Sequence, residues 1–166
     1  MDGGIPDSGT MLPVKCSSGM KWTSGNAASE WMNPGYACRS CHLGQNFLGQ
    51  NPRGESNLQY AMFFMGTAFA DFQEENLCMP KSVPAGAVVE ILGADGGVAL
   101  SLAVDPSSGN FRSTSTTSEV PLPYRARIRA NGMVRTMAAL QMSGDCNTCH
   151  TEQGREGAPG RIVWPQ

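Results

Sequence analysis

Two copies of one pattern, Cys-x-x-Cys-His, stand far apart in the sequence. Their members are Cys38, Cys41 and His42 in the first copy and Cys146, Cys149 and His150 in the second. This spacing lets two thiols form thioethers to the vinyl groups of one haem while the adjoining imidazole reaches the iron. The sequence therefore predicts two haem c groups, with His42 and His150 as the proximal iron ligands.

The main alternative is a zinc site in which the four motif cysteines form an all-sulfur tetrahedron. A second alternative makes each cysteine pair a local disulfide. Neither gives the histidines a role, although the chain has only two of them and both follow a Cys-x-x-Cys directly. The haem interpretation is therefore favoured.

The sixth iron position needs a different donor, because both histidines are used as proximal ligands. The chain has 10 methionines, and a Met/His pair raises the haem potential relative to a pair of histidines. Met32 lies just ahead of the first motif, and Met137 and Met142 lie just ahead of the second. We expect the distal ligands among these three, with Met142 the weakest. A two-residue turn at Asn131-Gly132 would place Met137 opposite Ala126, where a methionine is more often part of a core.

Two further cysteines, Cys16 and Cys78, remain after the motifs are assigned. In an exported chain such a pair most often forms a disulfide, which here would close a loop of 62 residues (78 minus 16). A disulfide that closes a loop of this length stabilises the folded chain by roughly 4 kcal/mol. Two free buried thiols are the alternative.

The composition favours a mostly β protein. The chain has 166 residues with 20 Gly, 11 Pro and only 16% charged residues, which suits short strands joined by turns. Alternating or short apolar runs predict strands, with Asn131-Gly132 as a hairpin turn. The expected strands are residues 60–69, 87–92, 98–104, 110–116, 124–130 and 133–140. The fold class predicted is a small antiparallel β-sandwich with irregular N- and C-terminal haem-binding segments.

This interpretation divides one compact unit into four stretches. They are a disordered tether (1–15), an N-terminal haem-binding segment (16–58), the β-sandwich (59–141) and a C-terminal haem-binding segment (142–166). Arginines alternate along the strand at 124–130, and such a row is usually a solvated face. The other interpretation gives one or two of its arginines to haem propionates. Arg161 in the C-terminal segment is a further candidate for a propionate contact.

Charge and hydropathy limit the partners. A net charge of −2 without any run of Lys or Arg argues against nucleic acid, and no stretch of about eighteen apolar residues marks a transmembrane helix. Covalent haem attachment takes place outside the cytoplasm in bacteria. We therefore expect an exported protein of the periplasm, outer-membrane surface or extracellular space, whose export signal preceded residue 1.

Several blocks together resemble a group of exported bacterial di-haem cytochrome c-like proteins, often lipoproteins. The blocks are Met32-x-Pro34-Gly35-x-x-Cys38-x-x-Cys41-His42, Gly66-Thr67, residues 86–91, residues 143–151 and Gly157-Ala158-Pro159-Gly160-Arg161-Ile162. The resemblance implies two haems on a sandwich similar to transthyretin or carboxypeptidase regulatory domains, with Met32 and Met137 as distal ligands and a lipid anchor upstream. Members of the group often carry a histidine before the position of Cys78, and residues 72–75 of this chain contain none.

The sequence thus predicts a one-electron carrier or relay rather than an enzyme. Its partners would be redox proteins or neighbouring cytochrome subunits. The alternatives are a subunit of a polymeric extracellular cytochrome wire, a di-haem peroxidase-like enzyme, and a haem-free, zinc-binding interaction module.

Overall fold

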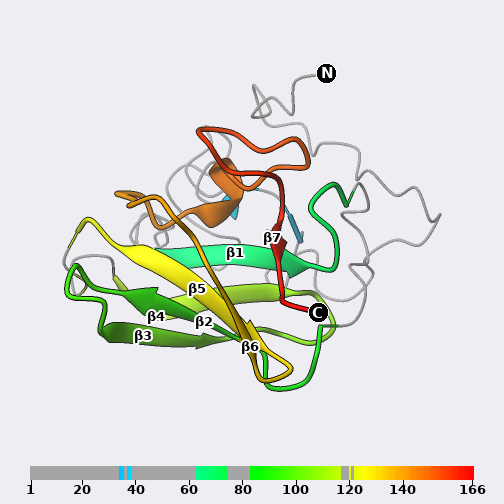
Figure 1. Ribbon diagram of the computed structural model, residues 1–166, viewed down its shortest axis with the longest axis horizontal. Coiled ribbons are helices and arrows are strands. Elements are labelled where there is room, and N and C mark those ends of the chain that lie inside the picture. Colours follow the sequence, from blue (N-terminus) through cyan, green and yellow to red (C-terminus); the bar gives the residue numbers. More distant parts are fainter. Residues whose placement is uncertain (1–33, 36, 39–62, 75–82, 117–119, 121) are drawn as a thin grey trace, which may run out of the picture.

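The structure is a computed structural model that describes residues 34–35, 37–38, 63–74, 83–116, 120 and 122–166 (Figure 1). This part of the chain contains seven strands and a single-turn 3-10 helix. The elements are β1 (Phe63–Phe69), β2 (Val88–Leu92), β3 (Val98–Ala103), β4 (Asn110–Thr116), β5 (Arg125–Ala130), β6 (Met133–Thr136), η4 (Cys146–Thr148) and β7 (Ile162–Val163). None of the helices within these ranges has the length and apolar character needed to cross a bilayer.

The strands form two sheets, and this confirms the predicted mostly β sandwich. One sheet has the order β4-β1-β7 and the other β3-β2-β5-β6. All the pairings are antiparallel except that of β1 with β7, which is parallel. Figure 1 shows η4 and the C-terminal loop on one side of β1, with the four-stranded sheet on the other.

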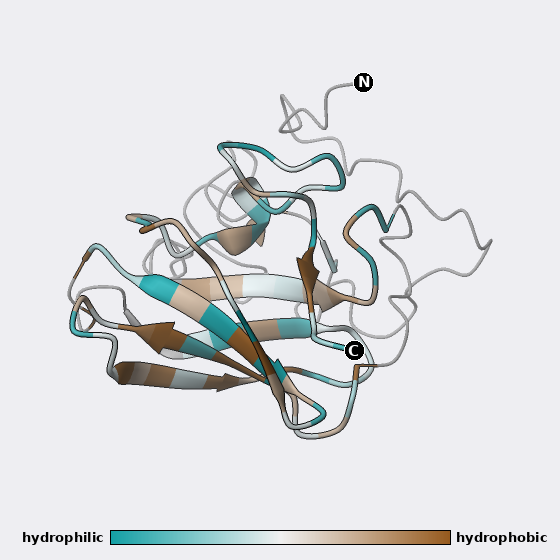
Figure 2. Cartoon of the chain, viewed as in Figure 1, coloured by the Kyte–Doolittle hydropathy of each residue, from teal (hydrophilic) through white to brown (hydrophobic). Residues whose placement is uncertain are grey.

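The core lies between the two sheets and follows from the alternation of side chains along their strands. Val89 and Ile91 of β2 are buried, and Phe64 of β1 meets Tyr124 edge to face with ring centroids 4.8 Å apart. Figure 2 shows the corresponding alternation of hydrophilic and hydrophobic residues along β5. The sandwich is therefore held by apolar burial from both sheets, and its rigid strands can position a site on the outside of β1.

Most of the strands lie where the pattern placed them, and the Asn131-Gly132 turn has positive φ at both residues, as a two-residue hairpin requires. The last predicted strand, 133–140, was too long, because β6 ends at Thr136. A continuous register would place residue 139 opposite Tyr124, but Gln141 pairs there instead. Two extra residues are therefore pushed out of the ladder between Met137 and Gln141.

The C-terminal segment, residues 142–166, is less irregular than predicted. Ile162 and Val163 form β7, which pairs with Ala68 and Phe69 of β1. The short run Ile162-Val163-Trp164 is too brief to stand out as a strand by periodicity, and its partner strand supplies the order. The segment is thus part of the sandwich and not an appendage to it.

Candidate functional site

The structure describes seven of the twelve residues predicted to form sites. Those inside the described ranges are Cys38, Cys146, Cys149, His150, Met137, Met142 and Arg161. Met32, Cys41, His42 and the predicted disulfide partners Cys16 and Cys78 lie outside the described residues. The second Cys-x-x-Cys-His motif can therefore be analysed completely.

The second motif closes a single turn. The N–H groups of Cys149 and His150 donate to the carbonyl of Cys146 at 3.3 and 2.9 Å, so that η4 brings the three chemical residues together within one turn. Cys146 and Cys149 are free thiols, and both are half-buried. The local fold therefore places Cys146, Cys149 and His150 on one turn of backbone.

The His150 ring is fixed by a backbone carbonyl. Its Nδ1 lies 2.9 Å from the carbonyl oxygen of Gly160, and because a carbonyl only accepts, Nδ1 carries the proton. Burial lowers the pKa of His150, although the bond to Gly160 opposes this. The imidazole is therefore neutral at pH 7 with its lone pair on Nε2, the form in which histidine binds a metal.

The loop that supplies this carbonyl needs glycine at two positions. A Cβ on Gly154, where φ is +70°, would stand 1.9 Å from the Ala158 oxygen. One on Gly160, where φ is +143°, would stand 2.4 Å from the oxygen of Phe72, which accepts the Arg161 N–H. Both glycines therefore allow backbone to approach backbone, and they set where the acceptor for His150 lies.

Both thiols are held in the protonated form. Burial, followed by the charge of Asp145, raises the pKa of Cys146 to about 12. Burial also raises the pKa of Cys149, helped by Glu156, whose carboxylate lies 3.5 Å from the sulfur. Neither cysteine has the lowered pKa that marks a thiolate nucleophile or redox dithiol.

The second motif is hydrogen-bonded along the edge of β1 that faces away from β4. The Met65 N–H donates to the Gly144 carbonyl at 2.9 Å ahead of the motif, and β7 pairs with the end of β1 after it. Between these two contacts the buried Asn147 bonds Thr67 twice. The Thr67 N–H donates to Asn147 Oδ1 at 3.0 Å, and Asn147 Nδ2 donates to Thr67 Oγ1 at 3.1 Å.

These two residues were missed by the sequence reasoning. The signals were an amide side chain between two cysteines and a single threonine within the apolar run of residues 63–69. A polar residue in a buried strand needs a partner, so Thr67 could have been singled out, although its partner could not.

The approach to the first motif meets the same strand. The buried Gly35 N–H donates to Thr67 Oγ1 at 2.7 Å, and the Gly35 carbonyl accepts from Arg161 Nη1 at 3.3 Å. Cys38, half-buried, follows three residues later. The structure therefore places Gly35, three residues before Cys38, beside the strand that holds the second motif.

Arg161 is buried within this assembly. Its Nε donates to the Glu74 carbonyl at 3.2 Å, and its guanidinium lies 5.0 Å from the centre of the Phe69 ring. It thus ties the loop to the connection after β1. The predicted propionate contact stays a prediction.

The two described methionines differ in their surroundings. The Met137 N–H donates to the Ala126 carbonyl at 3.0 Å, as the hairpin register predicted, and Met137 is half-buried. Met142 is 67% exposed immediately before the second motif. Their roles as distal ligands stay predictions.

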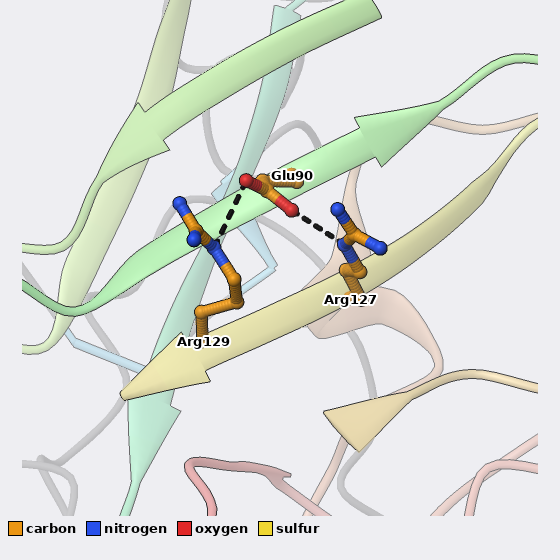
Figure 3. Close-up of polar contacts among 3 residues, drawn as sticks. All are labelled: Glu90, Arg127 and Arg129. Carbon is orange, nitrogen blue, oxygen red and sulfur yellow. Dashed lines mark hydrogen bonds and ion pairs between the residues drawn. The ribbon is translucent and has the colours of Figure 1, made fainter. Parts of the chain in front are cut away.

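The arginine row of β5 is partly neutralised by a buried carboxylate. Figure 3 shows Glu90 of β2 between Arg127 and Arg129, each of which turns its Nε toward one carboxylate oxygen. Glu90 is almost fully buried, whereas the side chains of Arg127 and Arg129 are 31% and 51% exposed. Arg127 and Arg129 are therefore ion-paired within the sheet rather than only solvated, and a contact of the row with haem propionates stays a prediction.

A comparison with protein-family models, curated proteins and solved structures finds no match to this chain. Within the described ranges, no three His, Cys, Asp or Glu side chains are grouped as ligands for a metal ion. The function is therefore argued from the residues of the site themselves.

Proposed function

We propose that this protein is a di-haem c-type cytochrome that carries or relays single electrons outside the cytoplasm. The observation that supports this most is the second motif, where the half-buried His150 donates a hydrogen bond from Nδ1 to the Gly160 carbonyl and follows two free thiols in the sequence. A fixed Nδ1–H leaves Nε2 available to iron, and a backbone acceptor of this kind orients metal-binding histidines in general.

The donor set fits covalent haem. On attachment, each thiol would add across a vinyl C=C bond, with its sulfur joining one carbon and its proton the other, so the bonds would balance without an oxidant or reductant. Cys146 and Cys149 would supply the thioethers and His150 the axial nitrogen. Cys38, Cys41 and His42 would do the same at the first motif, on the evidence of their identical spacing.

The bound haem would supply a reversible one-electron change at iron, while the chain sets its surroundings. Partial burial of His150 lowers its pKa and so favours the neutral imidazole. The Gly160 carbonyl makes the imidazole a stronger donor, which tunes the potential. Met32, Met137 or Met142 would complete the coordination, and redox proteins or neighbouring cytochrome subunits would exchange the electrons.

The proposal is tested by maturing the full chain in a bacterial host that exports it and attaches haem c. Mass spectrometry should show the polypeptide plus two haems, and a pyridine haemochrome spectrum should have the band position of thioether-linked haem. Cys146→Ser/Cys149→Ser should lose one haem. The matched control Cys16→Ser/Cys78→Ser, outside both motifs, should keep two.

A chain that folds without binding haem would contradict the proposal. A polypeptide without added porphyrin mass, recovered folded from a host that matures another c-type cytochrome in parallel, would overturn the proposal. Zinc bound in proportion to the four motif cysteines would then support the all-sulfur site in its place.

A further inference from the structure

Thr67 joins the segments that carry the two motifs. Its hydroxyl donates to Asn110 Oδ1 at 2.7 Å and accepts from Gly35 N at 2.7 Å and from Asn147 Nδ2 at 3.1 Å. A hydroxyl has one donor and two acceptor positions, so all three are used. Thr67 is 1% exposed, and hydrogen bonds in such a dry position fix geometry strongly.

Asn147 has only one orientation that satisfies this arrangement. Its Oδ1 must face the Thr67 N–H, and its Nδ2 must then face the Thr67 hydroxyl. Two parallel bonds remove both translation and rotation of the side chain. Because Asn147 stands between the two cysteines of the second motif, the motif is held rigidly against β1.

Cys38, the first residue of the first motif, is linked to the same hydroxyl through Gly35 and a short piece of chain. Three residues separate Gly35 from Cys38, and an extended chain covers at most about 3.6 Å per residue, so Cys38 lies within roughly 11 Å of Gly35. Arg161, eleven residues after His150, holds the other side of Gly35 through its carbonyl. Figure 1 shows the coloured pieces of residues 34–38 and η4 on the same side of β1.

We propose that Thr67 is a positioning residue that holds both haem-attachment segments in one frame, so that the two haems form an electronically coupled pair. This inference rests on the proposed function of the chain as a di-haem cytochrome. The coupling comes from a shared hydroxyl in a rigid strand, and it needs no direct contact of Thr67 with either haem.

A fixed pair has two measurable signatures. Two neighbouring porphyrins couple their Soret transitions and give a two-signed circular-dichroism band, whose size falls steeply as their separation grows. Two interacting redox sites also titrate as a pair, and their two apparent potentials are spread further apart than those of isolated sites. Neither signature depends on a partner protein or on a rate of electron transfer.

The test compares Thr67→Val with Thr67→Ser in the full, haem-loaded chain. Valine keeps the shape and the methyl that faces Gly109 but removes the hydroxyl, whereas serine keeps the hydroxyl and removes the methyl. We expect Thr67→Val to lose most of the two-signed Soret signal and to narrow the gap between the two potentials. Thr67→Ser should retain both, although it too is destabilised.

If Thr67 had only a structural role, both variants would have a lower melting temperature and the same haem–haem coupling. Two haems bound in both variants, with Soret signal and potential gap equal to those of the wild type, would therefore overturn the inference while leaving the proposed function intact. A wild-type chain that binds no haem would overturn both.

A second measurement applies if Thr67→Val does not fold. The Soret circular dichroism of the wild type is compared with the sum of two single-haem variants, Cys38→Ser/Cys41→Ser and Cys146→Ser/Cys149→Ser. A wild-type spectrum that differs from the sum by a two-signed band supports a coupled pair. A spectrum equal to the sum overturns it.

Discussion

Substituting the glycine that positions the His150 acceptor should damage the second site far more than substituting a neighbouring glycine. In Gly160→Ala, the new Cβ would lie 2.4 Å from the Phe72 oxygen and 3.0 Å from its carbonyl carbon, and φ is +143°. In Gly157→Ala, φ is +88°, but the new Cβ has open space around it. The two substitutions share their chemistry and their loop and differ in the collision with Phe72.

The magnitudes follow from that difference. A positive φ at alanine costs on the order of 1–2 kcal/mol, and both variants bear a cost of this kind. Forcing an additional methyl group against packed atoms adds about 1–3 kcal/mol, and only Gly160→Ala bears this cost. The smaller freedom of alanine in the unfolded chain favours both variants equally. We therefore expect Gly160→Ala to be less stable than Gly157→Ala by about 2 kcal/mol.

Urea unfolding of the haem-free chain, followed by tryptophan fluorescence, measures this difference from the midpoints at equal slope. In the haem-loaded protein, mass spectrometry should find Gly160→Ala depleted in the second haem and Gly157→Ala loaded normally, because only the former displaces the carbonyl that orients His150. Equal midpoints for the two variants would refute the steric reasoning. Equal haem content despite unequal midpoints would refute the link between the Gly160 carbonyl and the histidine.

Three other substitutions test the scaffold. Glu90→Gln should cost about 2 kcal/mol in urea unfolding, below the usual cost of breaking a buried pair because its two arginines are partly exposed and can rehydrate. Burial tends to raise the pKa of Asp105, but hydrogen bonds from the serines that follow it outweigh burial and leave the pKa below 3.8. Its stabilisation is therefore present above that pH and lost as pH falls through the folded pKa. Asp105→Asn should cost about 1 kcal/mol at neutral pH and match the wild type in acid, as urea midpoints at both pH values would show. Tyr124→Phe removes the hydroxyl that donates to the Ser143 carbonyl and should lower stability by about 1 kcal/mol, measured in the same way.

The sequence predicted the sandwich well because its signals were local. Alternation along β3 and the Asn131-Gly132 turn depend on neighbouring residues only, and the structure has both where they were expected. The end of β6 was missed because the two residues pushed out before Gln141 depend on where Tyr124 finds a partner. Pairing over long sequence distances has no local signature.

The site shows the same division. Cys146, Cys149 and His150 were singled out from their spacing alone, because covalent attachment of one haem would require that spacing. Their supports were not found. Gly160 is ten residues from His150, and Thr67 is 80 residues from Asn147, so each contact exists only once the strands have paired.

One strand explains why the two predicted haem-binding segments need the sandwich between them. β1 is paired along one edge with β4, and its other edge receives Gly144 at Met65, the Asn147 amide at Thr67 and β7 at Ala68 and Phe69. The C-terminal segment therefore contacts β1 at three places: near its start, at its middle and near its end. Gly35, three residues before Cys38, is hydrogen-bonded to the same threonine. If the proposed function holds, a relay between two haems would need a fixed separation, and a central strand would supply it with less ordering of long side chains than direct contacts between two irregular segments would require.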